Sequence, residues 1–308
     1  ATANMIAKFA NGYADDLAST SLIASNKQIV VIPAMNSEMW NNPINKKNVS
    51  ILIKAGIEFI GPEYGRLSCG EIGLGRLSKP KKINKSLTEY LNNTQIFRNK
   101  NCLITAGPTI EPIDDIRYLS NHSSGKQGYE IAKQMILSGA NVTLISGPTN
   151  LQAPFKSKLI KIKTAEEMYK AVKKNLKTDI AIFTAAVADV SPKTFSKVKI
   201  KKENLKKINL KKNKDILYEI SLSKKSRPKI VIGFAAETTN HIKNAKIKLI
   251  RKNCDAIVLN KIDKKNNVFG SNINKISIIT KEKILNFKKT TKINVAKKIT
   301  KFIHELSL

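Results

Sequence analysis

The stretch that most constrains the fold is residues 102–146, where a strand, a polar loop, a helix and a second strand follow one another. It begins with the β-favouring residues CLIT and turns at Gly107-Pro108, and the helix is expected after Ser123-Ser124-Gly125. NVTLIS (141–146) supplies the second strand. Such a strand–helix–strand unit builds a parallel sheet, so the sequence predicts an α/β fold.

The loop of this unit is long, small and polar where it meets the helix. Free N–H groups and the dipole of a helix N-terminus favour an anion there, most often a phosphate. The loop matches neither common phosphate-binding pattern: Gln127 follows Gly125-Lys126 where a Walker A loop needs Ser or Thr, and no GxGxxG follows the strand. On spacing alone, an anion site and a plain strand-to-helix connection both stay open.

Strands and helices alternate through the rest of the chain, and 308 residues are enough for two domains. We expect two Rossmann-like α/β domains with mainly parallel sheets. The first covers residues 1–80 and the second residues 101–308, and the polar, charged residues 81–100 link them.

Four apolar residues at helical spacing predict one amphipathic helix over residues 1–20: Ile6, Phe9, Tyr13 and Leu17. Short strands are expected at 28–32 and 57–60. The glycine-rich stretch 61–77 is predicted to be a mobile loop rather than a regular element. It suits either a flap over an anionic substrate or a plain surface loop. In the second domain, NNVFGSN (266–272) is a predicted loop.

The net charge of +32 raises the question of nucleic-acid binding. The lysines are spread over most of the chain, and no nucleic-acid-binding motif is present, so we expect small polyanionic substrates instead. Three distant cysteines without CxxC spacing favour a reducing, cytoplasmic location over a disulfide or zinc framework. No apolar run is long enough to cross a membrane, and no signal peptide is recognisable.

Several long motifs, in one order along the chain, resemble the bifunctional family of coenzyme A biosynthesis that joins phosphopantothenoylcysteine decarboxylase to phosphopantothenate–cysteine ligase. The motifs similar to the flavin-dependent decarboxylase are ATANMIAKFANGYADDLAST (1–20), PAMNSEMW (33–40) and SCGEIGLGRL (68–77). Those similar to the ligase are ITAGPTIEPIDDIRYLSNHSSGKQG (104–128), AAVAD (185–189), KIKK (199–202) and GFAAET (233–238).

The resemblance implies two reactions. In the ligase, CTP activates the carboxylate of 4′-phosphopantothenate as an acyl-cytidylate, and the amine of L-cysteine displaces CMP. In the decarboxylase, FMN oxidises the thiol of the product to a thioaldehyde, carbon dioxide leaves, and the reduced flavin returns the electrons to give 4′-phosphopantetheine. The family also implies a homo-oligomer.

For the ligase, the resemblance assigns Asn121 to the acyl-cytidylate step and places Mg²⁺ on the nucleotide phosphates, with Asp189 as an indirect metal contact. The positions that match the CTP site are Ala185, Asp189, Lys199, Lys214, Asp215, Ile216, Leu217, Phe234, Lys248 and Lys252. Four further lysines match no motif and are expected to be solvated charge: Lys193, Lys197, Lys206 and Lys207.

For the decarboxylase, the resemblance assigns Asn36 to the substrate carboxylate and Cys69 to protonation of the enethiolate intermediate. Asn4 and Met35 are placed on the flavin and substrate side. The family pattern also needs a strand, a flavin-phosphate loop and a histidine before the ATAN motif, and none of the three histidines lies in the first third of the chain. We therefore expect this half to be truncated at its N-terminus. The alternative is a ligase with a vestigial decarboxylase half.

Overall fold

The computed structural model describes residues 1–25, 27–93, 96–204, 207–261 and 271–308. They form two compact units, Ala1–Asn93 and Thr94–Leu308, which we call unit 1 and unit 2. The predicted loop residues 266–270 and the predicted solvated Lys206 lie outside the described ranges. No helix within those ranges is long and apolar enough to cross a membrane.

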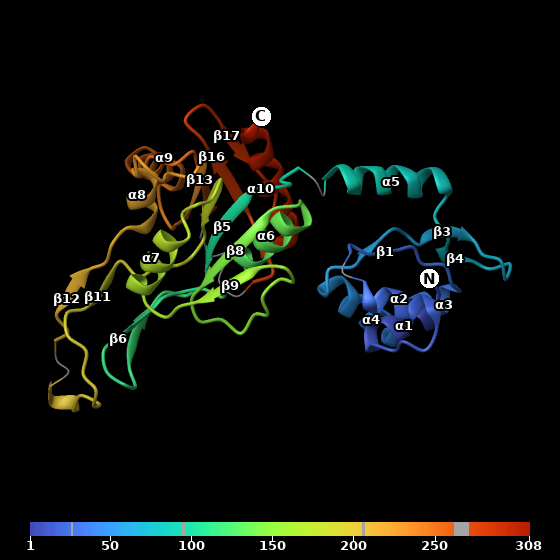
Figure 1. Cartoon of the computed structure of the whole chain (residues 1–308), viewed down its shortest axis with the longest axis horizontal. Coiled ribbons are helices and arrows are strands. Elements are labelled where there is room, and N and C mark those ends of the chain that lie inside the picture. Colours follow the sequence, from blue (N-terminus) through green and yellow to red (C-terminus); the bar gives the residue numbers. More distant parts are fainter. Residues whose placement is uncertain (26, 94–95, 205–206, 262–270) are drawn as a thin grey trace. The chain divides into compact units, whose positions relative to one another are not determined.

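Unit 2 is built on a sheet whose described strands have the order β17-β16-β14-β13-β10-β5-β8-β9 (Figure 1). Its parallel strands are β5 (Asn101–Ala106), β8 (Asn141–Ser146), β9 (Lys158–Lys161), β10 (Ile180–Phe183), β13 (Ile230–Glu237) and β14 (Ala256–Lys261). At one edge, β16 (Ile276–Ile279) and β17 (Ile284–Asn286) are antiparallel. The predicted mainly parallel α/β sheet is confirmed.

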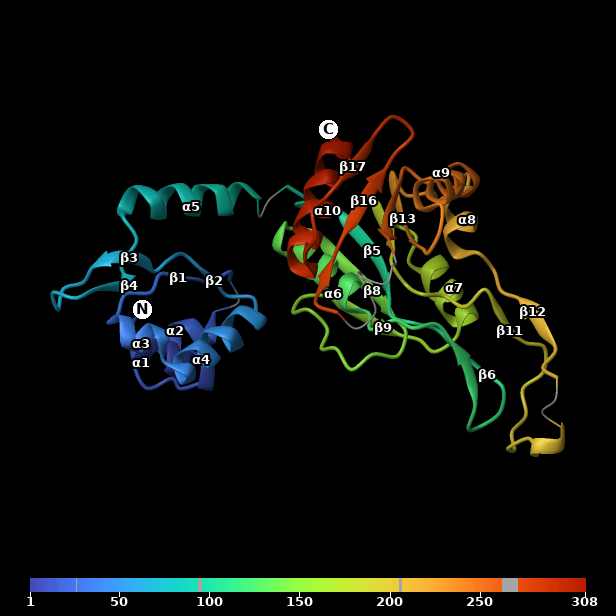
Figure 2. The same cartoon turned by 180° about the vertical axis from the view of Figure 1, so that it is seen from behind.

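Helices cover both faces of this sheet (Figure 2). One face packs against α6 (Lys126–Leu137) and α10 (Lys292–Ser307), and the other against α7 (Ala165–Lys174), α8 (Ile216–Ser221) and α9 (His241–Lys252). Successive side chains of a strand point to opposite faces, so Ile104 of β5 joins the first core and Leu103 joins the second. Both are fully buried.

The strand order reverses beside β5. From β5 the chain moves outward to β8 and β9, and β10 then returns to the other side of β5. The connections that leave β5 and β10 therefore diverge to opposite faces of the sheet. In open α/β sheets the crevice at such a point, beside the carboxyl ends of the strands, is where ligands bind.

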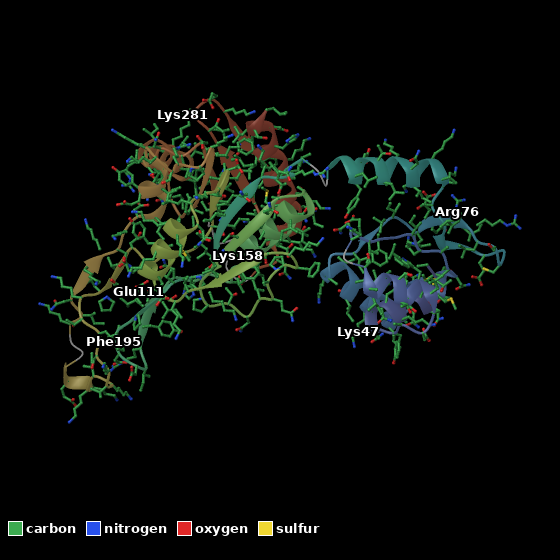
Figure 3. All side chains as sticks on the ribbon, viewed as in Figure 1. Lys47, Arg76, Glu111, Lys158, Phe195 and Lys281 are labelled. Carbon is green, nitrogen blue, oxygen red and sulfur yellow. The ribbon has the colours of Figure 1, made fainter. Side chains whose placement is uncertain are left out.

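Two hairpin segments extend from the carboxyl side of the sheet, and we call them the arm. They consist of β6 (Ile110–Pro112) with β7 (Tyr118–Ser120), and β11 (Val190–Pro192), the 3₁₀ turn η1 (Lys202–Asn204) and β12 (Leu210–Lys212). Asp114 joins them, because it accepts from the guanidinium of Arg117 at 2.6 Å and from the backbone N–H of Ile200 at 3.1 Å. Figure 3 labels Phe195 on the arm, where its side chain is exposed.

Unit 1 begins with two helices where one was predicted, α1 (Ala3–Asn11) and α2 (Leu17–Ala24). Gly12 ends α1 with a φ of 76°, a left-handed conformation that suits glycine, and the Asp16 side chain caps the first turn of α2. The predicted apolar stripe therefore stops at Gly12, and Leu17 is 84% exposed. The other helices of the unit are α3 (Ser37–Asn41), α4 (Pro43–Lys54) and α5 (Pro80–Asn93).

The glycine-rich stretch 61–77 is an antiparallel hairpin and not the predicted irregular loop. Its strands are β3 (Glu63–Arg66) and β4 (Ile72–Arg76). The glycines of β4 allow the hairpin to lie against the loop 33–36, since a Cβ added to Gly75 would lie 2.2 Å from the carbonyl oxygen of Met35. A short parallel pair, β1 (Val30–Val31) and β2 (Glu58–Phe59), completes the unit.

The predicted linker, residues 81–100, contains most of α5, and the two units divide between Asn93 and Thr94.

Candidate functional site

A cavity of about 1050 Å³ opens at the carboxyl ends of β5, β10, β13 and β14 in unit 2. It lies at the point where the strand order reverses, and its volume is slightly above the range of about 300–1,000 Å³ that is usual for ligand sites. Its lining comes from the loop before α6, the turn after β10, the segment 212–218, and α9. Space of this size suits more than one substrate at once.

Hydrogen bonds hold together the two loops at the centre of the cavity. The hydroxyl of Thr184 donates to the carbonyl oxygen of Thr105 at 2.6 Å. The side-chain amide of Asn121 donates to the carbonyl oxygen of Val187 at 3.1 Å. The segments after β5 and β10 are therefore joined to each other, and Asn121 lies over the turn after β10.

On the side of α8 and α9, the cavity is lined by cations that already have acidic partners. Lys248 lies 2.7 Å from Glu237, and Lys252 forms an ion pair with Asp215. Lys248 and Lys252 are four residues apart on α9 and therefore share one helix face. Glu237 and Asp215 orient two positive charges toward one end of the cavity, an arrangement suited to phosphate oxygens.

The cavity brings together nearly all the residues that the sequence assigned to the ligase. Lining it are Asn121, Ala185, Asp189, Lys214, Asp215, Ile216, Leu217, Phe234, Lys248 and Lys252. Lys199 is not among the lining residues: it is exposed on the arm, as are Lys193, Lys197 and Lys207. Within one chain, the lysine of the KIKK motif therefore stands apart from the other assigned residues.

The polar residues of the cavity lining that sequence reasoning missed include Lys126, Arg251, Asn260, Asn274 and Lys292. Lys126 follows a glycine at the start of α6, which is a recognisable sequence signal for an anion site. Lys292 and Asn274 carry no such signal, because they reach the cavity from the C-terminal part of the chain.

The first turn of α6 lies very close to the strand ends beneath it. A Cβ on Gly128 would lie 2.4 Å from the hydroxyl oxygen of Thr184 and 2.7 Å from the Cβ of Ala106. Glycine at this position therefore allows the N-terminus of α6 to point into the cavity at close range. Its N-cap residue is Gly125, which has no side chain to cap the free N–H groups of that turn.

A second group of candidate residues lies in unit 1, between the loop 33–36 and the hairpin. The side-chain amide of Asn36 donates to Glu71 at 2.7 Å, and its nitrogen lies 3.7 Å from the sulfur of Cys69. The Cys69 thiol also lies 3.7 Å from the same Glu71 oxygen. The two residues predicted for decarboxylation are thus neighbours, and Glu71 is a partner that the sequence did not predict.

The residues assigned to the flavin side lie in the same unit. Met35 is fixed by its N–H, which donates to the carbonyl oxygen of Gly75 at 3.0 Å, and Asn4 is exposed in the first turn of α1. Asn45 lies under Met35: its amide contacts the Met35 sulfur, and its buried Oδ1 has no partner in the described structure. An unfilled acceptor at this place fits an N–H of a flavin ring.

Metal binding by protein side chains alone has no support within the described ranges, where no group of three or more His, Cys, Asp or Glu residues is positioned to hold an ion. Asp189 and Asp215 are carboxylates in the cavity lining. Mg²⁺ commonly uses one or two carboxylates together with substrate phosphates. The cavity therefore fits a metal that arrives with a nucleotide.

Two family models match the chain. The model described as "DNA/pantothenate metabolism flavoprotein C-terminal domain" matches residues 97–306, and the model described as "Flavoprotein" matches residues 1–92. The matches divide the chain close to the boundary between the two units.

Curated relatives are similar over nearly the whole chain. The "Coenzyme A biosynthesis bifunctional protein CoaBC" of Borreliella burgdorferi is 43% identical over 308 residues, which are 99% of this chain and 78% of the relative. The protein of the same name from Bacillus subtilis is 41% identical, over 92% of this chain and 70% of the relative. A crystal structure of the C-terminal domain of a CoaBC protein has a TM-score of 0.59 and 36% identity, and the match covers 69% of this chain and 97% of that domain.

Proposed function

The chain belongs to the family of coenzyme A biosynthesis bifunctional proteins CoaBC, and we propose on that premise that unit 2 joins 4′-phosphopantothenate to L-cysteine at the expense of CTP. It is an enzyme of coenzyme A biosynthesis with ligase and decarboxylase activities. We propose in addition that the nucleotide is CTP, that the metal is Mg²⁺, and that individual residues act as described below.

The observation that carries the proposal is the convergence of residues from five separate segments on one cavity. Asn121 follows β7, Asp189 follows β10, Phe234 lies on β13, and Lys248 and Lys252 come from α9. The segment 214–217 completes the lining beside them. These are the residues expected to hold CTP and its acyl adduct, and the fold brings all of them to one cavity.

Each residue has a role in acyl activation. Lys248 and Lys252 neutralise charge on the triphosphate as pyrophosphate departs. Asp189 would hold Mg²⁺ indirectly, and the ion, when bound, would supply further positive charge on the phosphates. The amide of Asn121 donates a hydrogen bond to the acyl-cytidylate, and stabilises the oxyanion that forms when the cysteine amine attacks. Ala185 and Phe234 are half-buried in the cavity wall, and they limit the access of water to the activated acyl group, which would otherwise be hydrolysed.

The test is pyrophosphate release with every combination of nucleotide, 4′-phosphopantothenate and L-cysteine. We expect sustained release only when all three are present, because without L-cysteine the reaction stops at the acyl-cytidylate after about one turnover, and we expect CTP to be preferred over ATP. Asn121→Ala is expected to lower kcat by about 100-fold or more, the usual effect of removing one oxyanion donor, while CTP binding stays close to that of the wild type. Release that does not depend on 4′-phosphopantothenate would show the assignment to be wrong.

For unit 1, we propose that Asn36 and Cys69 act on the ligation product. Asn36 holds the substrate carboxylate without competing for its proton, and the Cys69 thiol protonates the carbon that loses carbon dioxide. FMN supplies the oxidation and reduction when bound, and Asn4, Met35 and the unfilled acceptor of Asn45 are the residues placed to receive it. Cys69→Ala is expected to stop formation of 4′-phosphopantetheine and leave pyrophosphate release unchanged.

We propose that the protein is a cytoplasmic homo-oligomer in which the arm packs against a second copy. The arm exposes a set of apolar side chains whose burial would favour association: Ile116 (61% exposed), Tyr118 (58%), Phe195 (53%) and Val198 (72%). Phe195→Asp is expected to raise the dissociation constant of the oligomer in sedimentation velocity. Lys246→Asp, an exposed change on α9, serves as the control. A monomeric wild-type protein at assay concentrations would contradict this part of the proposal.

A further inference from the structure

We propose that Tyr169 of α7 positions residues 214–217, which we call the nucleotide segment, by holding the ammonium group of Lys214 over its aromatic ring. The inference rests on the proposed ligase function, which assigns this segment to CTP, and it adds a residue that the family resemblance does not name. Tyr169 is not among the residues that line the cavity in the described structure. It therefore acts through Lys214, as a positioning residue, and does not touch the nucleotide.

The contact between Tyr169 and Lys214 joins the wall of the cavity to the helix α7. The Nζ of Lys214 lies 4.3 Å from the centre of the Tyr169 ring. A cation within about 6 Å of the centre of an aromatic ring is attracted to the negative face of that ring. The ammonium group of Lys173, one turn further along α7, lies 5.1 Å from the same ring centre. Tyr169 therefore holds one cation of its own helix and one cation of the cavity wall.

The Tyr169 ring is a fixed support for this cation, because the hydrophobic core holds the ring in place. Tyr169 is 7% exposed and belongs to the same apolar cluster as Val172 of α7 and Ile216 of the nucleotide segment. The side chain of Lys214, by contrast, is 51% exposed. An exposed lysine has many conformations, and the attraction of the ring favours those that direct its ammonium group to α7.

Three consecutive residues attach this part of the chain to three different neighbours. The backbone N–H of Asn213 donates to the carbonyl oxygen of Asp189 at 2.9 Å, which joins it to the turn after β10. Asp215 forms an ion pair with Lys252 of α9. Lys214, between them, makes the contact with α7. Loss of this contact leaves the nucleotide segment with fewer attachments, and the binding of CTP must then remove the additional freedom of the segment.

Lys214 also lies near a carboxylate of α7, but this contact is weaker than the contact with the ring. The Nζ of Lys214 is 3.9 Å from Glu166, whose side chain is 52% exposed and also lies 3.6 Å from Lys170. An exposed ion pair at this distance contributes little, because water and salt screen it. The Tyr169 ring carries no charge that must lose its water when a cation approaches. We therefore assign the positioning role to Tyr169 and not to Glu166.

The experiment measures pyrophosphate release by the full chain at varied CTP concentration. Tyr169→Leu removes the ring, Tyr169→Phe keeps it, and Lys214→Met removes the cation. Glu166→Gln tests the ion pair, and Lys170→Met, an exposed change on α7, is the matched control. Circular dichroism checks that each variant is folded. If Tyr169→Leu does not fold, increasingly fluorinated phenylalanines at position 169 replace it, because fluorine weakens the negative potential of the ring face and keeps the ring in the core.

We expect Tyr169→Leu and Lys214→Met each to raise the KM for CTP by about 3- to 10-fold, the usual effect of losing one cation–π contact, with kcat within about twofold. Tyr169→Phe should stay close to the wild type, because it keeps the ring face. The double variant Tyr169→Leu/Lys214→Met should be no worse than the worse single variant, because both changes remove the same contact. In the fluorinated series the KM for CTP should rise with the degree of fluorination. Glu166→Gln and Lys170→Met should behave as the wild type.

Four outcomes would overturn the inference. Additive losses in the double variant would show that Tyr169 and Lys214 act independently. An equal loss in Tyr169→Phe and Tyr169→Leu would assign the effect to the hydroxyl group, and a loss in Glu166→Gln equal to that in Lys214→Met would assign it to the ion pair. A KM for CTP that changes neither in folded Tyr169→Leu nor with fluorination would exclude a positioning role. The failure of the proposed function itself looks different, because the wild-type chain would then release no pyrophosphate from CTP, and the inference would be wrong along with it.

Discussion

Gly128 is the residue at which a single added methyl group should disturb both the stability and the site of unit 2. In Gly128→Ala the new Cβ would lie 2.4 Å from the Thr184 hydroxyl and 2.7 Å from the Cβ of Ala106. Neither separation is tolerated between non-bonded atoms, and both neighbours are attached to strand ends that the core holds in place. The first turn of α6 or the Thr184 side chain must therefore move.

The size of the effect follows from three terms. Overpacking of a close contact costs about 1–3 kcal/mol. Displacing Thr184 also weakens its 2.6 Å hydrogen bond to Thr105, which costs about 1 kcal/mol. The better helix propensity of alanine offsets about 1 kcal/mol. The free energy of unfolding should fall by about 1–3 kcal/mol, which for a domain of roughly 200 residues lowers Tm by about 2–12 °C.

The assay is scanning calorimetry combined with tryptophan fluorescence. The single tryptophan, Trp40, lies in unit 1 and reports on the unfolding of that unit. The Tm from fluorescence should therefore be unchanged, while the Tm of unit 2 in calorimetry should fall. In Gly128→Ala/Thr184→Ala the hydroxyl is absent, so the loss should be smaller than the sum of the two single losses. A Gly128→Ala protein as stable as the wild type, or strict additivity in the double variant, would refute the reasoning.

The other predictions concern charge and thiol chemistry. Lys252→Met should raise the KM for CTP by about 10-fold or more with the KM for cysteine unchanged, since it removes one of the paired cations of α9; Lys246→Met, exposed on the same helix, is the kinetic control. The guanidinium of Arg117 holds the pKa of Asp114 below its ordinary value. Asp114 therefore stabilises the fold fully above about pH 4 and loses that contribution as the pH falls through the lowered pKa. Asp114→Asn should thus unfold at a lower temperature than the wild type at pH 7, with a gap that narrows in acid. Burial raises the pKa of Cys102 and raises that of Cys254 to about 12. A thiol reagent should therefore label only exposed Cys69 in the native chain and all three cysteines in urea.

The parallel sheet of unit 2 was predictable because its strands are buried on both faces. Strands such as β5, β10 and β13 then appear as continuous apolar runs, and the polar or small residues that follow them mark the carboxyl edge of the sheet. The positions of Ala185 and Phe234 beside one cavity follow from that edge, whereas Asn121 reaches the cavity from the end of the β6–β7 hairpin. The motif resemblance added the chemical roles, which periodicity does not contain.

The hairpin of unit 1 was missed for a physical reason. Glycine is depleted in strands, so five glycines in 61–77 indicated an irregular loop. In β4, however, glycine is required by tertiary packing: a side chain on Gly73 would meet Ser37, and one on Gly75 would meet the backbone of Met35. The composition of a strand that lies flat against another backbone resembles that of a loop, and only the contact distinguishes them.

Lys126 and Lys292 show the limit of sequence reasoning most clearly. In a chain this rich in lysine, a single Lys after a helix-capping threonine looks like one more solvated charge, and Lys292 would have been counted as such. Its importance arises because α10 packs beside α6, which brings Gln127 against the backbone of Lys292 across 165 positions. Lys292 then differs from most other lysines of the chain because its side chain is buried. Exposed lysines such as those of the arm keep their water, whereas Lys292, at 7% exposure, depends on the groups that the fold places around it. A pattern of charged residues in a sequence therefore indicates a binding site only when the structure shows which of the charged side chains are buried.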